Sequence, residues 1–110
     1  MPVYIIAEIG INHNGDLEIA KELIDLASES GANAVKFQKR TLDLVYTEEL
    51  LSSERESPWG TTQREQKEGL EFELDDYKII DEYCKKKNID WFASAWDLES
   101  QNFLNQFNLP

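Results

Sequence analysis

The sequence predicts an α/β fold built from β-α units around a parallel sheet. Three apolar stretches rich in β-branched and aromatic residues end in polar side chains, and segments with helical periodicity separate them. Such units occur in open doubly wound sheets and in (β/α)8 barrels. The glycine-rich dinucleotide motif is absent after the first stretch, which weakens the first alternative. A complete barrel takes about 250 residues. If the fold is a barrel, this chain therefore corresponds to its first three β-α units.

The first β-α unit is predicted over the first thirty or so residues. A strand from Val3 to Ile9 is almost continuously apolar, as is typical of a strand buried on both faces, and Glu8 interrupts it near its end. Residues 12–15 are turn formers, and Asp16 can cap the following helix. Apolar residues recur in that helix at the helical period: Leu17, Ala20, Leu23, Ile24 and Ala27.

A second strand and a long irregular segment follow. Gly31 supplies a left-handed stop to the first helix, and a strand from Ala34 to Gln38 begins almost at once. Periodicity then fails from Lys39 to about Gly69, a longer span than compact domains usually leave without regular structure. A short helix is predicted at Thr47–Leu51. The segment also contains Trp59, and disordered linkers seldom contain such large aromatic residues. We therefore expect an ordered lid.

In the last third of the chain, the sequence pattern predicts a helix, a strand and another helix. A buried stripe marks the first of these helices: Leu74, Tyr77, Ile80 and Cys84. It ends in three lysines, residues 85–87, which suit the negative end of the helix dipole. Asp90–Ala95 is the third strand, Asp97 can cap the last helix, and Phe103, Leu104 and Phe107 are its apolar positions. Asn108–Pro110 ends where a fourth strand would be expected to begin.

The composition predicts one globular domain and excludes several classes of partner. Apolar residues make up 41%, and 22 acidic against 11 basic residues give a net charge of −11, which repels nucleic acid and anionic lipid headgroups. Cys84 is the only cysteine, which excludes an intrachain disulfide and favours a reducing compartment. The first apolar run ends at Glu8, too early for a signal peptide or membrane span. We therefore expect a cytoplasmic protein.

Polar side chains near the ends of the first two strands are candidate site residues. Glu8 can act as an acid–base group or can accept backbone N–H groups of the following loop, and its position alone does not decide between the two. Lys36 lies inside a buried strand and needs an anionic partner. A salt bridge to Glu8 is slightly favoured over a substrate anion or a Schiff base. Gln38 points to the same side as Lys36, so the two suit a polyol or an anion.

The third strand and the first loop add further candidates. The hydroxyl of Ser94 can bind an anion, and Trp96, on the same side, can cover a sugar, although a core position is favoured for Trp96. His13 has no second histidine with which to share a metal, so we interpret it as a hydrogen-bonding loop residue. The sequence contains no nucleophile–base–acid set, phosphate loop or paired-cysteine motif.

Three motifs resemble the sialic acid synthase family, which includes N-acetylneuraminate synthase and its legionaminate and pseudaminate relatives. The motifs are Ala7–Gly15, Ala34–Gln38 and Trp59–Glu65, and the likeness runs from about Ile5 to Pro110. The resemblance implies a partial (β/α)8 TIM barrel, with residues 1–110 as its amino-terminal part. The rest of the barrel and a small C-terminal antifreeze-like domain would lie beyond this chain.

The resemblance also implies a reaction. The family condenses phosphoenolpyruvate with an N-acetylated hexosamine, N-acetylmannosamine in the type case, to give N-acetylneuraminate or a related nonulosonic acid and phosphate. C3 of the enol attacks an open-chain aldehyde that a divalent metal (Mn²⁺ or Mg²⁺) polarises, water adds at C2, and a tetrahedral intermediate loses phosphate. By motif, Glu8 would be the acid–base or charge-stabilising group, Lys36 and Ser94 would hold phosphoenolpyruvate, and Gln38 would contact the sugar.

The remaining implications concern the rim of the site and the whole enzyme. Asn12 and Trp96 are further candidate substrate contacts. The metal-binding histidines would lie beyond residue 110, and the complete enzyme would be a homodimer. Two alternatives stay open: a truncated, non-catalytic module that acts through oligomer or partner binding, and an aldolase-type barrel in which Lys36 forms a Schiff base.

Overall fold

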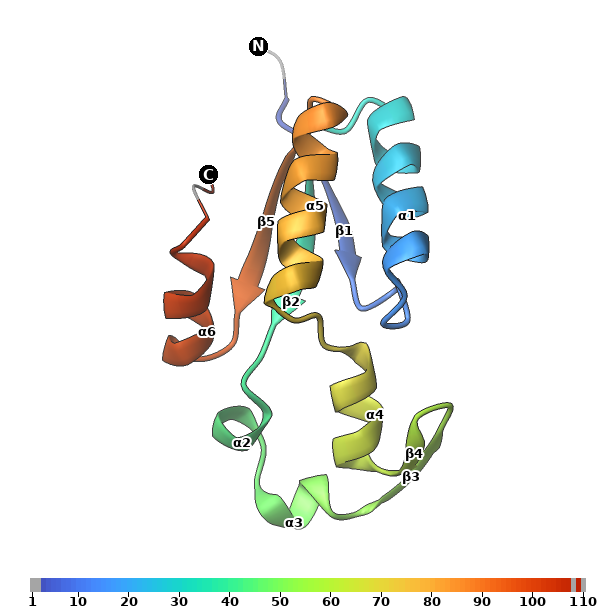
Figure 1. Cartoon of the computed structure of the whole chain (residues 1–110), viewed down its shortest axis with the longest axis vertical. Coiled ribbons are helices and arrows are strands. Elements are labelled where there is room, and N and C mark those ends of the chain that lie inside the picture. Colours follow the sequence, from blue (N-terminus) through green and yellow to red (C-terminus); the bar gives the residue numbers. More distant parts are fainter. Residues whose placement is uncertain (1–2, 108, 110) are drawn as a thin grey trace.

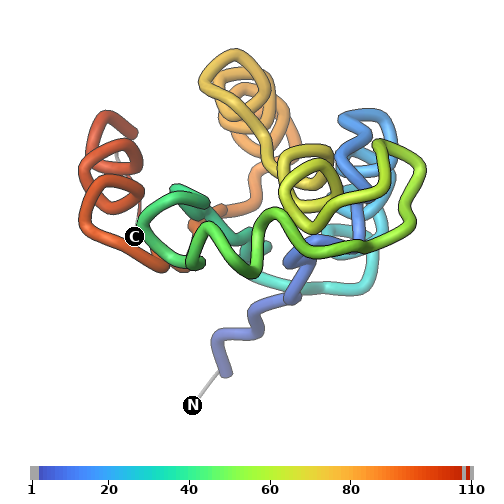
Figure 2. The backbone as a smooth tube through the Cα atoms, turned by 90° about the horizontal axis from the view of Figure 1, so that it is seen from below, coloured from blue at the N-terminus to red at the C-terminus, as the bar shows by residue number. Residues whose placement is uncertain are grey.

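A computed structural model describes residues 3–107 and 109 of the chain. Three parallel strands form one sheet in the order β1–β2–β5, and they comprise β1 (Ile6–Gly10), β2 (Ala34–Lys39) and β5 (Asp90–Ala95). Three helices pack on the same face of this sheet, namely α1 (Leu17–Glu29), α5 (Leu74–Lys86) and α6 (Leu98–Leu104) (Figures 1 and 2). The predicted sequence of three β-α units around a parallel sheet is confirmed.

The two faces of the sheet differ because side chains alternate along each strand. Val35, Phe37 and Trp91 point toward the helices and are buried. On the other face, Glu8, Lys36 and Phe92 lie side by side in register. The described residues place no helix over this second face, as the view along the strands shows (Figure 2). We call it the uncovered face.

The first strand is shorter and less buried than its apolar sequence predicts. Val3, Tyr4 and Ile5 precede β1 and are exposed, because pairing with β2 begins at Ile6 opposite Ala34. Ile6 itself is 45% exposed, since it points to the uncovered face. The expectation of a strand that starts at Val3 and is buried on both faces is therefore wrong.

The predicted helix boundaries agree with the structure at most positions. Asp16 caps α1, and Gly31, with φ of +88°, follows the end of that helix. Asp97 caps α6 by accepting the N–H of Ser100 at 2.7 Å. Phe107, predicted as a helical position, lies after the last residue of α6 and packs against the core instead. The prediction for residues 108–110 falls largely outside the described residues.

The core lies between the sheet and the helices. Tyr77, Ile80 and Cys84 of the predicted α5 stripe are fully buried. Tyr77 stacks on Trp91 with ring centroids 5.5 Å apart, and its hydroxyl donates to the carbonyl of Gln38 at 3.0 Å. Helix α5 thus fixes the end of β2, from which the polar side chains project. No helix in the described residues has the length and apolar character needed to cross a membrane.

Residues 40–73, here called the lid, connect β2 to α5 and extend beyond the carboxyl ends of the strands (Figure 1). They contain five short elements: α2 (Leu42–Val45), α3 (Glu48–Leu51), β3 (Glu54–Ser57), β4 (Gly60–Thr62) and α4 (Gln63–Leu70). The predicted order of this segment and its short helix are confirmed. The other four elements were not predicted.

The sequence of α4 explains why periodicity missed it. Only Leu70 is buried among its residues, so it has no apolar stripe. A cap defines its start instead: the hydroxyl of Thr62 accepts the N–H of Glu65 at 3.2 Å, and the Glu65 carboxylate accepts the N–H of Thr61 at 3.2 Å.

Candidate functional site

An ion pair lies on the uncovered face where β1 and β2 run side by side. Glu8 and Lys36 are register partners, and the Lys36 Nζ lies 3.0 Å from the Glu8 Oε2. The side chains are 51% and 31% exposed, respectively. The predicted salt bridge is confirmed. A pair this exposed adds about 1 kcal/mol or less to stability, so both groups stay accessible to a ligand at little structural cost.

Gln38 and Ser94 extend this polar group toward the ends of the strands. They are register partners on β2 and β5, and alternation places them on the same face as Lys36. Glu8 lies in the same area through its pairing with Lys36, and a bulge follows it at the end of β1, with φ of +55° at Gly10. A Cβ at Gly10 would lie 3.2 Å from the Glu8 Oε1 and 3.6 Å from the Gln38 Nε2. The glycine therefore leaves room between these two side chains.

The other two predicted contacts lie at the rim. Asn12 is exposed on the loop after β1, where it lines a hollow of about 350 Å³ together with Glu8. Trp96 follows β5, is 48% exposed and has its ring 6.4 Å from that of Tyr46. The core position favoured for Trp96 is therefore wrong, because its side chain belongs to the row that the helices do not cover.

His13 supports the loop that follows β1. It is 2% exposed, its ring stacks on Phe72 with centroids 4.0 Å apart, and its Nδ1 accepts the N–H of Gly15 at 2.9 Å. Burial lowers the pKa of His13 to about 4, so the ring is neutral at pH 7. Its predicted role as a hydrogen-bonding loop residue is confirmed. Among the described residues, no group of three or more His, Cys, Asp or Glu side chains is arranged to hold a metal.

The lid is seated on that loop through close backbone contacts. A Cβ at Gly15 would collide with the carbonyl oxygen of Gly69, and a Cβ at Gly69 would collide with the Trp59 ring. Glycine is thus required at both positions for the lid and the loop to approach this closely. The predicted motifs around Gly15 and Trp59 meet in space for this reason.

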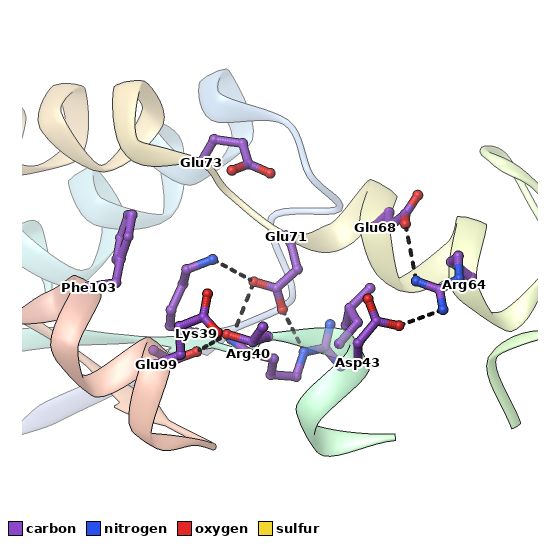
Figure 3. Close-up of a pocket in the computed structure, with 12 residues that line it drawn as sticks. Lys39, Arg40, Asp43, Arg64, Glu68, Glu71, Glu73, Glu99 and Phe103 are labelled. Carbon is purple, nitrogen blue, oxygen red and sulfur yellow. Dashed lines mark hydrogen bonds and ion pairs between the residues drawn. The ribbon is translucent and has the colours of Figure 1, made fainter. Parts of the chain in front are cut away.

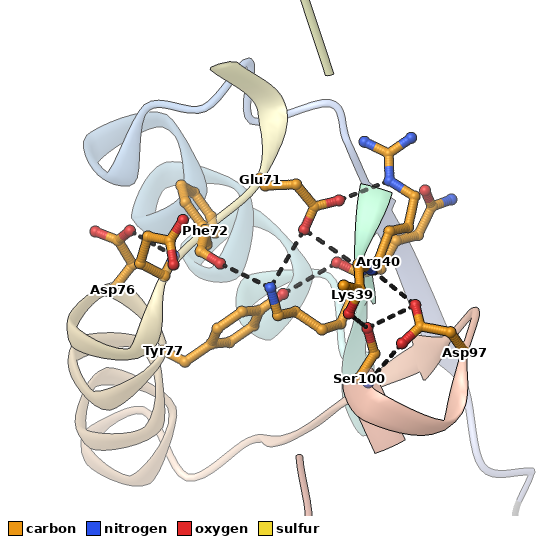
Figure 4. Close-up of polar contacts among 11 residues, drawn as sticks. Lys39, Arg40, Glu71, Phe72, Asp76, Tyr77, Asp97 and Ser100 are labelled. Atoms are coloured by element: carbon orange, nitrogen blue, oxygen red, sulfur yellow. Dashed lines mark hydrogen bonds and ion pairs between the residues drawn. The ribbon is translucent and has the colours of Figure 1, made fainter. Parts of the chain in front are cut away.

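A buried ion pair that the sequence did not reveal fixes the two ends of the lid (Figure 4). The Nε of Arg40 donates to the Glu71 Oε1 at 2.6 Å, and the Lys39 Nζ lies 3.6 Å from the Glu71 Oε2. Nearby, the N–H of Thr41 donates to the Asp97 Oδ2 at 2.7 Å. The only sign of this ion pair in the sequence is the pair of adjacent basic residues, Lys39 and Arg40, near the end of the predicted strand. Their partner is thirty residues away in the sequence, so no local pattern identifies it.

A cavity of about 360 Å³ lies between the lid and α6 (Figure 3). It is lined mainly by charged side chains, and its wall includes Lys39 and Phe103, which belong to the helix side of the sheet. Glu71 and Glu68 on its wall form ion pairs with Arg40 and Arg64. The cavity is therefore a charged junction between elements, and it lies on the opposite face of the sheet from Glu8 and Lys36.

The chain is similar to known proteins over nearly its whole length. Residues 23–110 match the model of the NeuB family. The chain is 46% identical to N-acetylneuraminate-9-phosphate synthase of Drosophila melanogaster over 110 residues, covering 98% of this chain and 30% of that protein. It is 40% identical to the protein of the same name from Homo sapiens over 111 residues, covering 99% of this chain and 31% of that protein.

The fold is similar to that of a solved structure as well. The crystal structure of N-acetylneuraminic acid (sialic acid) synthetase from Leptospira borgpetersenii in complex with citrate superposes with a TM-score of 0.79 and 32% identity. The match covers 99% of this chain and 34% of that one. The chain thus spans about a third of the length of these relatives, and its parallel α/β units correspond to part of the synthetase fold.

Proposed function

The chain belongs to the NeuB family, and from this premise we propose that it forms part of the substrate site of a nonulosonic acid synthase. The proposed reaction joins phosphoenolpyruvate to N-acetylmannosamine or a related 2-acetamido sugar. The observation that supports it best is the accessible Glu8–Lys36 ion pair, with Gln38 and Ser94 on the same sheet face. The names of the Drosophila and Leptospira relatives describe reactions of this class.

The proposal assigns one role to each of four side chains: Glu8, Lys36, Gln38 and Ser94. The ammonium of Lys36 and the hydroxyl of Ser94 bind the anionic groups of phosphoenolpyruvate, and the amide of Gln38 binds sugar hydroxyls. A bond forms between C3 of phosphoenolpyruvate and the aldehyde carbon, water adds at C2, and the C2–O bond to phosphate then breaks. Glu8 lies beside Lys36, where its carboxylate can stabilise the positive charge that develops at C2 or transfer the proton of the attacking water.

Asn12 and Trp96 complete the proposed contacts at the rim. Asn12 offers an exposed amide on the loop after β1, and the half-exposed ring of Trp96 offers a flat apolar surface to a sugar. The roles of both residues in binding are part of the proposal.

A divalent metal, a homodimeric assembly and a cytoplasmic location also belong to this proposal. The described residues offer no set of side chains that fits a metal, and the one histidine is buried with its Nδ1 already accepting a hydrogen bond. The ligands of Mn²⁺ or Mg²⁺ would therefore come from residues outside this chain.

The Schiff-base alternative is less well supported. Lys36 pairs with a carboxylate at 3.0 Å, which uses the ammonium form, whereas Schiff-base formation needs the free amine. Borohydride reduction in the presence of a carbonyl substrate would trap a covalent adduct on Lys36 if this alternative were correct.

The alternative of a non-catalytic module has one observation in its favour. The uncovered face leaves Ile6 and the preceding Val3–Ile5 exposed, which is unusual for apolar residues at a sheet. A chain that acts only by packing this face against another surface would show a defined oligomer or complex but no turnover.

The test of the proposed function is phosphate release by the complete gene product. Phosphoenolpyruvate, Mn²⁺ and N-acetylmannosamine should together give phosphate and a nonulosonic acid. Mannosamine, which lacks the acetyl group, is the matched control and should react much more slowly. If no 2-acetamido sugar, free or phosphorylated, gives turnover, the proposed function is wrong.

A further inference from the structure

Arg40 connects the charged junction between the lid and α6 to the aromatic rim of the candidate site. It lies one residue beyond β2, at the carboxyl-terminal edge of the sheet, and its side chain is 5% exposed. Its Nε donates to the Glu71 Oε1 at 2.6 Å (Figure 4), and its Cζ lies 5.6 Å from the centroid of the Trp96 ring. One buried side chain thus contacts both the residue that anchors the lid and a residue of the uncovered face.

Two aromatic rings lie beside the Arg40 guanidinium. Its Cζ is 5.8 Å from the centroid of the Tyr46 ring, and its Nη1 donates to the Tyr46 hydroxyl at 3.0 Å. The rings of Tyr46 and Trp96 are 6.4 Å apart. A guanidinium attracts an aromatic ring within about 6 Å of its centroid. The buried Arg40 Nη2 has no hydrogen-bond partner among the described residues, so attraction to the two rings helps to offset this missing hydrogen bond.

The backbone of Trp96 is fixed by the sheet, but its indole is half exposed. The N–H of Trp96 donates to the carbonyl of Lys39 at 3.1 Å, whereas the residue as a whole is 48% exposed. Exposed side chains change rotamer readily unless a neighbour restricts them. Within the described part of the chain, the aromatic and cationic groups beside this ring are those of Tyr46 and Arg40. The orientation of the indole therefore depends on this cluster.

We propose that Arg40 is a positioning residue for the acceptor sugar, because it holds the indole of Trp96 in one orientation at the rim of the substrate site. The Glu71 carboxylate fixes the guanidinium, and the guanidinium restricts the indole. Arg40 acts through Trp96 and makes no contact of its own with the sugar. Arginine is needed, because a lysine ammonium can also pair with Glu71 but offers no planar group to the rings. This inference rests on the proposed function, because it concerns the sugar of the same site.

The test is a double-mutant cycle between Arg40 and Trp96 in the complete gene product. KM values are measured for phosphoenolpyruvate and for N-acetylmannosamine, free or phosphorylated, whichever the wild type turns over. Arg40→Lys should raise the KM for the sugar by about 5-fold or more, because a cation–π contact is lost, and should leave the KM for phosphoenolpyruvate unchanged. In a Trp96→Ala background, Arg40→Lys should have no further effect on the KM for the sugar.

Lys39→Gln is the matched control for Arg40→Lys. Lys39 pairs with the same carboxylate of Glu71, at 3.6 Å, but its Nζ lies 4.9 Å from the Phe103 ring on the helix side of the sheet. Its loss should leave the KM for the sugar unchanged. An equal rise in this KM for both variants, or an undiminished effect of Arg40→Lys in the Trp96→Ala background, would overturn the positioning role although the synthase activity stands.

A measurement without turnover separates this inference from the proposed function. In protein labelled with fluorotryptophan, the fluorine resonance of Trp96 is identified by its loss in Trp96→Phe. Arg40→Lys should shift or broaden this resonance and leave that of the buried Trp91 unchanged. If Arg40→Lys does not fold, Tyr46→Phe gives the same readouts, because it keeps the ring and removes the hydrogen bond from Arg40.

An unaltered Trp96 resonance would refute the positioning role, whatever the KM values are. Absence of turnover with any 2-acetamido sugar in the wild type would instead overturn the proposed function, and with it the role of Arg40 in sugar binding.

Discussion

Acidification should destabilise this fold in part through His13, the only histidine of the chain. The folded protein holds the pKa of His13 at about 4 against an ordinary value of 6.5, because burial disfavours the charged ring. The unfolded chain therefore binds a proton as the pH falls below about 6.5, and the folded chain does not until about pH 4. Stability is lost progressively across this window. The difference between 6.5 and about 4 corresponds to about 3 kcal/mol at 1.36 kcal/mol per pKa unit.

The contribution of His13 can be separated from that of the 22 acidic residues by a matched variant. His13→Phe keeps a flat ring against Phe72 but cannot titrate. Urea unfolding of both proteins, followed by tryptophan fluorescence between pH 7.5 and pH 4, gives the difference in unfolding free energy at each pH. This difference should change by about 3 kcal/mol in favour of the variant as the pH falls. Because His13 is the only histidine of the chain, its ring resonances also report its pKa directly by NMR. Parallel loss of stability in both proteins, or a measured pKa near 6.5, would refute the reasoning.

Three further substitutions test the site and the lid. Lys36→Ala should weaken phosphoenolpyruvate binding about 10-fold or more, measured as KM in the complete gene product, because a charge-assisted contact is removed; an unchanged affinity would leave Lys36 with the salt bridge alone. Glu71→Gln should cost about 3–5 kcal/mol in urea unfolding, because Arg40 would stay buried without its carboxylate; a change below 1 kcal/mol would contradict this. Gly69→Ala should displace Trp59, seen as a red shift of its fluorescence, and should cost about 1–3 kcal/mol; an unaltered spectrum with full stability would show that the contact is not needed.

Local patterns in the sequence were sufficient for the β-α units. The strand from Ala34 and the strand Asp90–Ala95 are apolar runs bounded by turn formers, and the caps at Asp16 and Asp97 are single-residue signals that act on the adjacent helix. These features depend on neighbours within a few residues, so local sequence patterns are sufficient to predict them. The start of β1 cannot be predicted in this way, because it is set by where β2 begins to pair.

The lid and its anchor could not be predicted in the same way. The charged and polar residues of α4 do not form a helical apolar stripe, and the helix is held by a cap at Thr62 and by contacts with the rest of the lid. The pairing of Arg40 with Glu71 joins the two ends of a thirty-residue segment. The exposure of Trp96 likewise depends on which face of the sheet the helices cover, and a single strand does not contain that information.

The candidate site and the core are two consequences of one register. Phe37 is fully buried beneath the helices, whereas Lys36 and Gln38 on either side of it point to the uncovered face. A slip of one residue would expose Phe37 and bury two polar side chains, so the burial of the core fixes the position of the site. On β1, Glu8 lies opposite Lys36 in the same register that begins at Ile6, and the bulge comes only after it, between Glu8 and Gly10. Gly10, which follows that carboxylate, leaves room beside it, because a Cβ there would lie 3.2 Å from the Glu8 Oε1.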